Sequence, residues 1–205
     1  MKRALPLFVA KIADENDGIL CVSLVDLPAV EKDFQKFSKQ EKIQYKIENE
    51  EKRIIRGLIM SCDTPIYRRN GDFEYYISYQ PETIRIMAEK FLKENNQNMV
   101  DTQHNNQWVD GVNLVQLFIK DSEYGINPKG FEDVKDGSLF AEYKVNNDEI
   151  WGQIKSGEFK GFSLEGYFTV EETNEMVEEY FSNQEDSEDL EILDLINKIK
   201  DKLNR

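Results

Sequence analysis

Short β-prone runs separated by turn residues fill the first 170 residues, and this pattern is the strongest constraint on the fold. Helical patterns are few. One begins at Pro81 and places its apolar residues on one face, and another covers about residues 149–155. The chain has no regular βαβ alternation and no internal repeat. We therefore expect an α+β fold, mostly β, built as an antiparallel barrel or sandwich with flanking helices. The expected strands cover residues 5–12, 19–25, 43–47, 53–60, 73–79, 99–104, 112–119, 138–145 and 159–170.

Turn chemistry predicts how some of these strands connect. Residues 14–18 are rich in Asp, Asn and Gly, so they predict a hairpin between the first two strands. A charged turn at 48–52 predicts a second hairpin. Residues 63–72 hold a proline, a glycine and clustered charges, which are typical of a loop.

Charge and composition exclude several classes of protein. The net charge is −14, which disfavours nucleic-acid binding because phosphate contacts need a basic surface. No apolar run reaches about 18 residues and no signal-peptide pattern is present, so we expect no membrane association and a cytoplasmic location. The two cysteines, Cys21 and Cys62, are too few for a disulfide framework and lack the paired spacing of a zinc site. We expect no metal and no cofactor.

The last 35 residues differ from the rest of the chain. Residues 171–205 hold 12 acidic and 4 basic residues, a net charge of −8. Residues 171–189 have the composition of an acidic linker, and apolar residues from Leu190 to Leu203 recur at helical spacing. We predict a body at residues 1–170 and a tail at 171–205 that ends in an amphipathic helix. That helix could pair two copies of the chain or dock on a partner.

Two residues raise a catalytic hypothesis. Ser163 lies in the run Gly161-Phe162-Ser163-Leu164-Glu165-Gly166, and His104 is the only histidine. A serine becomes a good nucleophile when a base removes its proton, and histidine is the usual base. The run continues into more strand, so it lacks the strand-turn-helix context of an α/β-hydrolase nucleophile elbow. This disfavours a small-molecule hydrolase. A structural serine and a surface histidine remain the alternative reading.

The run from Trp151 to Gly166 resembles the signature of XkdF-like prohead serine proteases of tailed phages and prophages. Segments Val22–Ala29, Gly57–Met60 with Pro65–Arg68, and Tyr79–Ile84 followed by Gln103-His104 are similar to the same family and keep its order. The resemblance implies an assemblin-like β-barrel ringed by helices. It also implies Ser163 as nucleophile and His104 as general base.

The resemblance does not settle the third catalytic residue. Related prohead proteases carry an acidic residue in an E-x-S-L-V-like segment, and this chain has Cys21 at that position. Asp26, in the same segment, is our predicted substitute that orients His104. Glu165 and Asp101 are alternatives.

The resemblance thus implies a serine endopeptidase of phage head maturation, which cleaves scaffold and major capsid protein inside the immature capsid in the host cytoplasm. The alternative is an inactive virion or assembly protein that keeps the protease fold. The loss of the acidic residue at Cys21 favours this second hypothesis.

Overall fold

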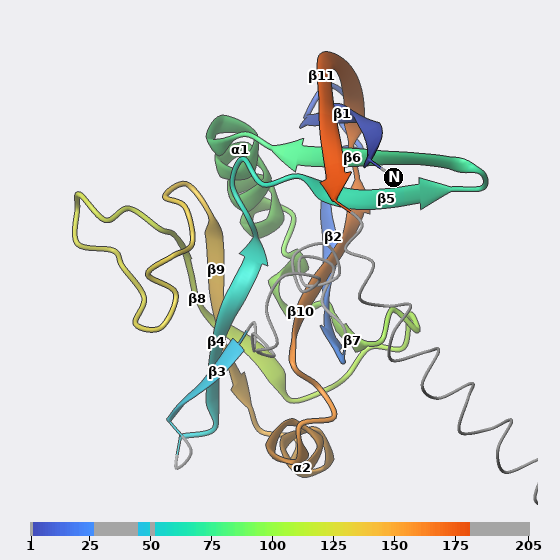
Figure 1. The fold of residues 1–205 in the computed structure, drawn as a ribbon. Helices are drawn as coiled ribbons and strands as arrows, with labels where there is room; N and C mark the ends of the chain where they lie inside the picture. The colour runs from blue at the N-terminus through green and yellow to red at the C-terminus, as the bar shows by residue number, and fades with distance from the viewer. Residues whose placement is uncertain (1, 27–44, 50–51, 181–205) are drawn as a thin grey trace, which may run out of the picture.

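The structure is a computed structural model and describes residues 2–26, 45–49 and 52–180 (Figure 1). The elements in these ranges follow in this order: β1 (Lys2–Lys11), β2 (Gly18–Val25), β3 (Tyr45–Asn49), β4 (Ile54–Met60), β5 (Ile66–Asn70), β6 (Phe73–Tyr79), α1 (Pro81–Lys93), η2 (Asn96–Asn98), β7 (Val100–Thr102), β8 (Val112–Ile119), β9 (Leu139–Val145), α2 (Asp148–Ser156), β10 (Gly161–Tyr167) and β11 (Thr169–Tyr180). The fold is mostly β with two α-helices, as the sequence predicts.

The described strands form three sheets, in the orders β11-β1-β6-β5, β10-β2-β7 and β3-β4-β9-β8. Two of the pairings, β1 with β6 and β2 with β7, are parallel. The expected antiparallel barrel is therefore not supported. β10 lies beside β4 (Figure 1), but no ladder joins them in the described residues. Side chains from both strands, including Ile59 and Phe162, line a small pocket.

The predicted hairpin around residues 14–18 is wrong, because β1 and β2 belong to different sheets. The turn redirects the chain. The Asp17 carboxylate accepts the N–H groups of Ala13 (2.9 Å) and Asp14 (3.0 Å) and the hydroxyl of Thr169 (2.8 Å). Asp17 thus ties this turn to the start of β11. The second predicted hairpin is confirmed as the antiparallel pair of β3 and β4.

Two further segments differ from the expectation. Residues 66–70, expected in a loop, form β5 and pair with β6, because Ile66 is buried in the core. The expected strand at 159–170 is divided at Phe168, and the chain moves from β10 in one sheet to β11 in another. β11 continues to Tyr180 along β1, so residues 171–180 are a strand and not a linker. The predicted tail helix lies outside the described residues.

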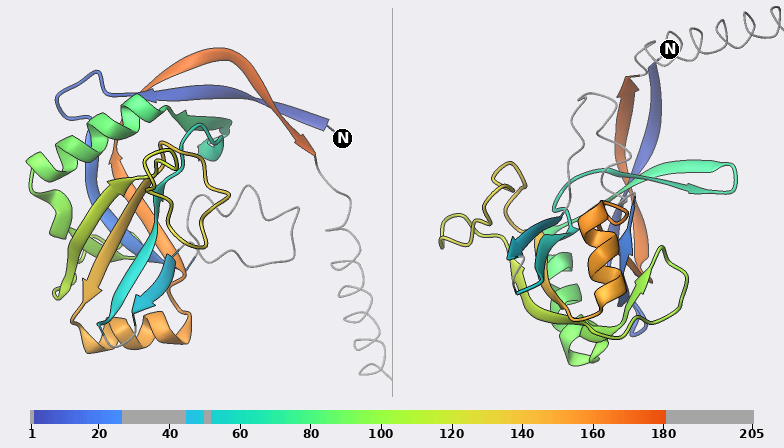
Figure 2. Two further views of the ribbon diagram at one scale, coloured as in Figure 1. Left: turned by 90° about the vertical axis from the view of Figure 1, so that its left-hand side faces the viewer. Right: turned by 90° about the horizontal axis from the view of Figure 1, so that it is seen from below.

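The main core lies between the sheets and α1. Helix α1 begins with Pro81 in its first turn and buries a stripe of apolar side chains, Ile84, Met87, Ala88 and Phe91. Helix α2 begins where the Asn147 side chain accepts the N–H of Ile150, and it ends at Gly157, which has a left-handed backbone. Figure 2 shows α2 at one end of the body and the β1–β11 ribbon at the other.

Gly166 sits where two backbones approach closely. β10 changes register with β2 between Glu165 and Gly166, and a Cβ at position 166 would stand 2.2 Å from the carbonyl oxygen of Gly18. Real Cβ atoms do not come so close to backbone atoms. The glycine therefore permits the bulge that lets β10 stay paired with β2 at the end of the strand.

We expect Gly166→Ala to lower the free energy of unfolding by about 1–3 kcal/mol, because the backbone must shift to admit the methyl group. Gly152→Ala is the matched control, since a Cβ there meets nothing within 4 Å on helix α2. That change is expected to raise stability by about 0.5–1 kcal/mol. Denaturant unfolding of the two variants measures both effects, and equal stabilities would contradict the close approach.

Candidate active site

A row of polar side chains crosses the three-stranded sheet β10-β2-β7. Ser163 on β10 pairs in register with Ser23 on β2, and Ser23 pairs with Asp101 on β7. Residues paired in this way present their side chains on the same face of a sheet. Their sequence neighbours belong to the other face, where Val22, Leu24, Val100 and Phe162 join the main core. The sheet therefore has one apolar face and one face that carries candidate catalytic groups.

Asp101 is the carboxylate of this row, and it has no exposed surface. It accepts a hydrogen bond from the Ser23 hydroxyl, and its other oxygen accepts the backbone N–H of Asn106 at 2.9 Å. Ser23 is also fully buried. These bonds satisfy polar groups that would otherwise be costly to bury. They also attach the loop after β7 to the sheet.

His104 lies in that loop, just beyond the end of β7. The expected strand at 99–104 stops at Thr102, and both Gln103 and His104 adopt left-handed backbone conformations with φ near 55°. The N–H of Gln103 donates to the carbonyl of Leu24 at 3.0 Å, which holds the turn against β2. Non-glycine residues in this conformation are uncommon and cluster at functional sites. The turn carries the imidazole back over the polar face.

The imidazole meets groups from two strands. Its Nδ1 lies 2.9 Å from the Ser23 Oγ and 3.8 Å from an Oε2 of Glu165. The His104 side chain is 38% exposed and that of Glu165 is 43% exposed, so the outer part of the site is open to solvent. Glu165 was an alternative third residue in the sequence, and the structure brings it to ion-pair distance of His104.

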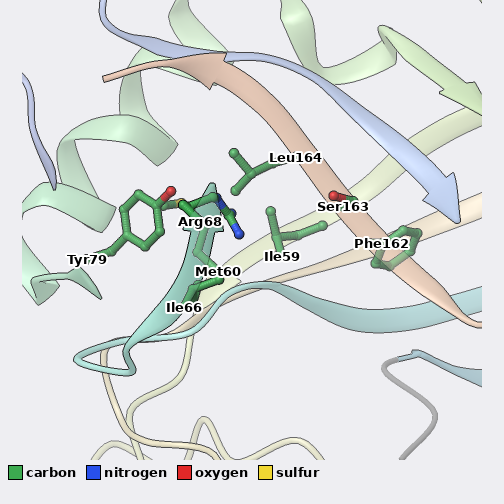
Figure 3. A pocket seen from close by; sticks show the side chains of 8 residues that line it. All are labelled: Ile59, Met60, Ile66, Arg68, Tyr79, Phe162, Ser163 and Leu164. Carbon is green, nitrogen blue, oxygen red and sulfur yellow. The ribbon is translucent and has the colours of Figure 1, made fainter. Parts of the chain in front are cut away.

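Ser163 lies on the same row but does not hydrogen-bond to His104 within the described residues. It is 9% exposed and lines a small pocket with residues of β4, β5, β6 and β10 (Figure 3). Arg68 and Tyr79 line the same pocket. Residues directly opposite each other on two antiparallel strands have Cα atoms about 5 Å apart. Ser163 is therefore one strand away from the hydroxyl that His104 touches.

Asp26 lies at the exposed end of β2. Its backbone N–H contacts the Gln103 side chain at 3.4 Å, and within the described residues its carboxylate has no hydrogen bond or ion pair with His104. A role for Asp26 in orienting His104 stays a prediction. Asp101 and Glu165 are the two acidic residues that the structure gathers around Ser23 and the imidazole.

Ser23 is the residue of this site that the sequence did not single out. The available signal was a hydroxyl inside the apolar run of residues 19–25, because a buried polar group needs a partner. That signal does not identify the partner. The pairing of β2 with β7 brings Asp101 to Ser23.

Cys21 pairs with Glu165 in register and lies 3.9 Å from its carboxylate. Burial, together with the negative charges of Asp101 and Glu165, raises the pKa of the Cys21 thiol to about 12. The thiol is therefore neutral at physiological pH and cannot replace an acidic residue as a charge. No group of three potential metal ligands gathers within the described residues, and none of the described helices is long and apolar enough to cross a membrane.

Comparisons with known proteins assign the chain to a family. A family described as "Putative phage serine protease XkdF" matches residues 40–175. The chain belongs to this family. It is 31% identical over 158 residues to the uncharacterized protein YqbD of Bacillus subtilis, covering 74% of this chain and 45% of that protein. It is 28% identical over 165 residues to the phage-like element PBSX protein XkdF of the same organism, covering 77% of this chain and 55% of that protein.

The chain thus spans about half the length of these curated relatives. No solved structure is significantly similar to it. The match includes His104 and Ser163, while Ser23 lies before its first residue.

The buried thiols yield a prediction about reactivity. Burial raises the pKa of Cys62 to about 11, so both thiols stay protonated in the folded chain at pH 8, and the thiolate is the reactive form. We expect iodoacetamide to leave the folded protein almost unlabelled at pH 8 and to label both residues in denaturant. Intact mass counts the adducts. Rapid labelling of Cys21 in the folded protein would contradict its burial.

The same shifts predict loss of stability at high pH. Both thiols ionise near pH 9.0 when unfolded and at higher pH when folded. The protonated thiols contribute to the free energy of unfolding, and this contribution is complete below about pH 9. It declines as the pH rises toward 12, because the unfolded chain loses these protons first. Cys21→Ser and Cys62→Ser should each reduce this alkaline slope in unfolding experiments.

Proposed function

We propose that this chain is a serine endopeptidase of phage head maturation that cleaves scaffold and major capsid protein within the immature capsid, in the host cytoplasm. Family membership supports the reaction class. The observation that carries the proposal is the position of the sole histidine, which rests on the polar row that includes Ser163. Acyl transfer requires a nucleophile and a base within hydrogen-bond reach, and Ser163 lies one strand away from the hydroxyl that the imidazole contacts.

In this proposal Ser163 attacks the scissile carbonyl and His104 takes its proton. The Nδ1 side of the imidazole faces Ser23, which leaves Nε2 for the Ser163 hydroxyl. Nε2 then passes the proton to the leaving amine, and water releases the acyl group by the reverse sequence. Catalytic hydrogen bonds often tighten only when substrate is bound, and the proposal requires that His104 and Ser163 come within hydrogen-bond distance in that complex.

A second candidate function is an assembly protein that keeps the fold without cleaving peptides. Two observations favour it. Ser163 and His104 share no hydrogen bond in the described residues, and the neutral Cys21 stands where related proteases carry an acidic residue.

Co-expression of the full chain with its own scaffold and major capsid protein tests the proposal. We expect discrete truncations of both partners with the wild type, measured by intact mass. Ser163→Ala and His104→Ala should each reduce the cleavage rate at least about 1000-fold, and the double variant should lose little more.

Ser156→Ala is the matched control, because Ser156 lies at the end of α2 and its hydroxyl bonds, within the described part of the chain, only to the carbonyl of Gln153. It should cleave like the wild type. Unchanged partner masses in every sample, with correctly assembled shells, would instead favour the inactive assembly protein. Cleavage that persists in Ser163→Ala would assign the nucleophile elsewhere.

A further inference from the structure

The buried pair of Ser23 and Asp101 has a chemical consequence for His104. Both residues lack exposed surface, so water cannot compete for their hydrogen bonds. The Asp101 carboxylate accepts the Ser23 hydroxyl at one oxygen and the Asn106 N–H at the other. An ionised carboxylate only accepts, so the single proton of the Ser23 hydroxyl is directed to Asp101.

The direction of the Ser23 hydroxyl proton determines which hydrogen bond Ser23 can form with the imidazole. With its proton committed to Asp101, the Ser23 oxygen faces Nδ1 of His104 at 2.9 Å with a lone pair. Only a protonated Nδ1 forms a hydrogen bond there. Neutral His104 must then carry its proton on Nδ1 and keep Nε2 bare, which is the form that a general base at Nε2 needs.

We propose that Ser23 and Asp101 are positioning residues that hold His104 as the Nδ1–H tautomer through the hydrogen-bonded chain Asp101–Ser23–His104. This inference rests on the proposed function for its catalytic meaning. Ser23 takes the place that a carboxylate occupies in a Ser-His-Asp triad, and Asp101 supplies the negative charge from behind it. Ser23 is not the nucleophile, because it is fully buried and its proton is engaged.

Other charged and titratable groups also face the imidazole. Glu165 approaches Nδ1 from β10 at 3.8 Å, beyond hydrogen-bond distance, and Cys21 on β2 lies next to Glu165. Asp26 follows the last residue of β2 and is exposed, and its backbone N–H contacts the Gln103 side chain. Among the described residues, Ser23 alone lies within hydrogen-bond distance of Nδ1.

Because His104 is the only histidine, selective ¹⁵N-histidine labelling of the full chain gives one pair of ring-nitrogen signals without assignment. We expect wild-type spectra above the imidazole pKa to show protonated Nδ1 and bare Nε2. Ser23→Ala should shift the population toward the Nε2–H tautomer that free imidazole side chains favour. Asp101→Asn should shift it in the same direction.

Glu165→Gln separates charge from tautomer. It should remove the charge near the imidazole while leaving the proton on Nδ1. Ser78→Ala and Asp72→Asn are matched controls, a buried strand serine and an exposed aspartate away from the site, and both should give wild-type spectra. Ser23→Ala removes the middle member of the Asp101–Ser23–His104 series, and Asp101→Asn alters its buried end, so a folded sample of either variant tests the proposal.

Cleavage kinetics give a second readout. We expect Ser23→Ala and Asp101→Asn each to lower kcat by roughly 100-fold or more, toward the loss of about 10⁴-fold that a wrong tautomer causes in a triad. The double variant should lose no more than the worse single variant, because both act through one contact.

The two proposals can fail separately. Wild-type spectra with Nε2–H, or a tautomer that follows Glu165→Gln or Asp26→Asn instead of Ser23→Ala, would overturn the assignment of Ser23 and Asp101 whatever the activity. If Ser23→Ala shifts the tautomer as expected but no Ser163-dependent cleavage occurs, the Asp101–Ser23–His104 hydrogen bonds are supported. The proposed protease function is then overturned.

Discussion

The register between β10 and β2 is the constraint on which the rest of the site depends. It sets Ser163 opposite Ser23, and the parallel pairing of β2 with β7 then sets Ser23 opposite Asp101. A slip of one residue would turn these polar groups into the core and bring Phe162 and Leu24 to the surface. The apolar face of the same strands resists that slip, because its side chains are almost completely buried in the main core. Packing on one face thus holds the chemistry on the other.

Burying polar groups on this face of the sheet costs free energy, and nearby hydrogen bonds offset that cost. A buried carboxylate is destabilising unless its oxygens accept hydrogen bonds. Asp101 receives them from Ser23 and from the backbone of Asn106. The second bond also stabilises a turn in which Gln103 and His104 adopt the left-handed conformation. The group that satisfies the buried charge is therefore part of the loop that presents the imidazole.

The position of Cys21 shows how an altered motif can be accommodated. The thiol is neutral, so it adds no negative charge beside His104. Asp101 from β7 and Glu165 from β10 bring carboxylates to the same region from different strands. Glu165 lies two residues after Ser163 on β10, and its carboxylate reaches to 3.8 Å from the imidazole Nδ1. The acidic environment of the histidine does not depend on the residue at position 21.

The sequence by itself determined the mostly β class, most of the strands, the start of α1, and the family. These follow from local periodicity and turn chemistry, which depend on neighbours in the chain. It also singled out His104 and Ser163, since the chain has a single histidine and a glycine-flanked serine. Only the tertiary structure decided that β1 and β2 enter different sheets, that β10 and β11 separate at Phe168, and that Ser23 joins Asp101 to His104. These contacts link residues about 80 positions apart or more, and strand pairing at that separation is set by competition between whole faces for burial, which no local pattern records.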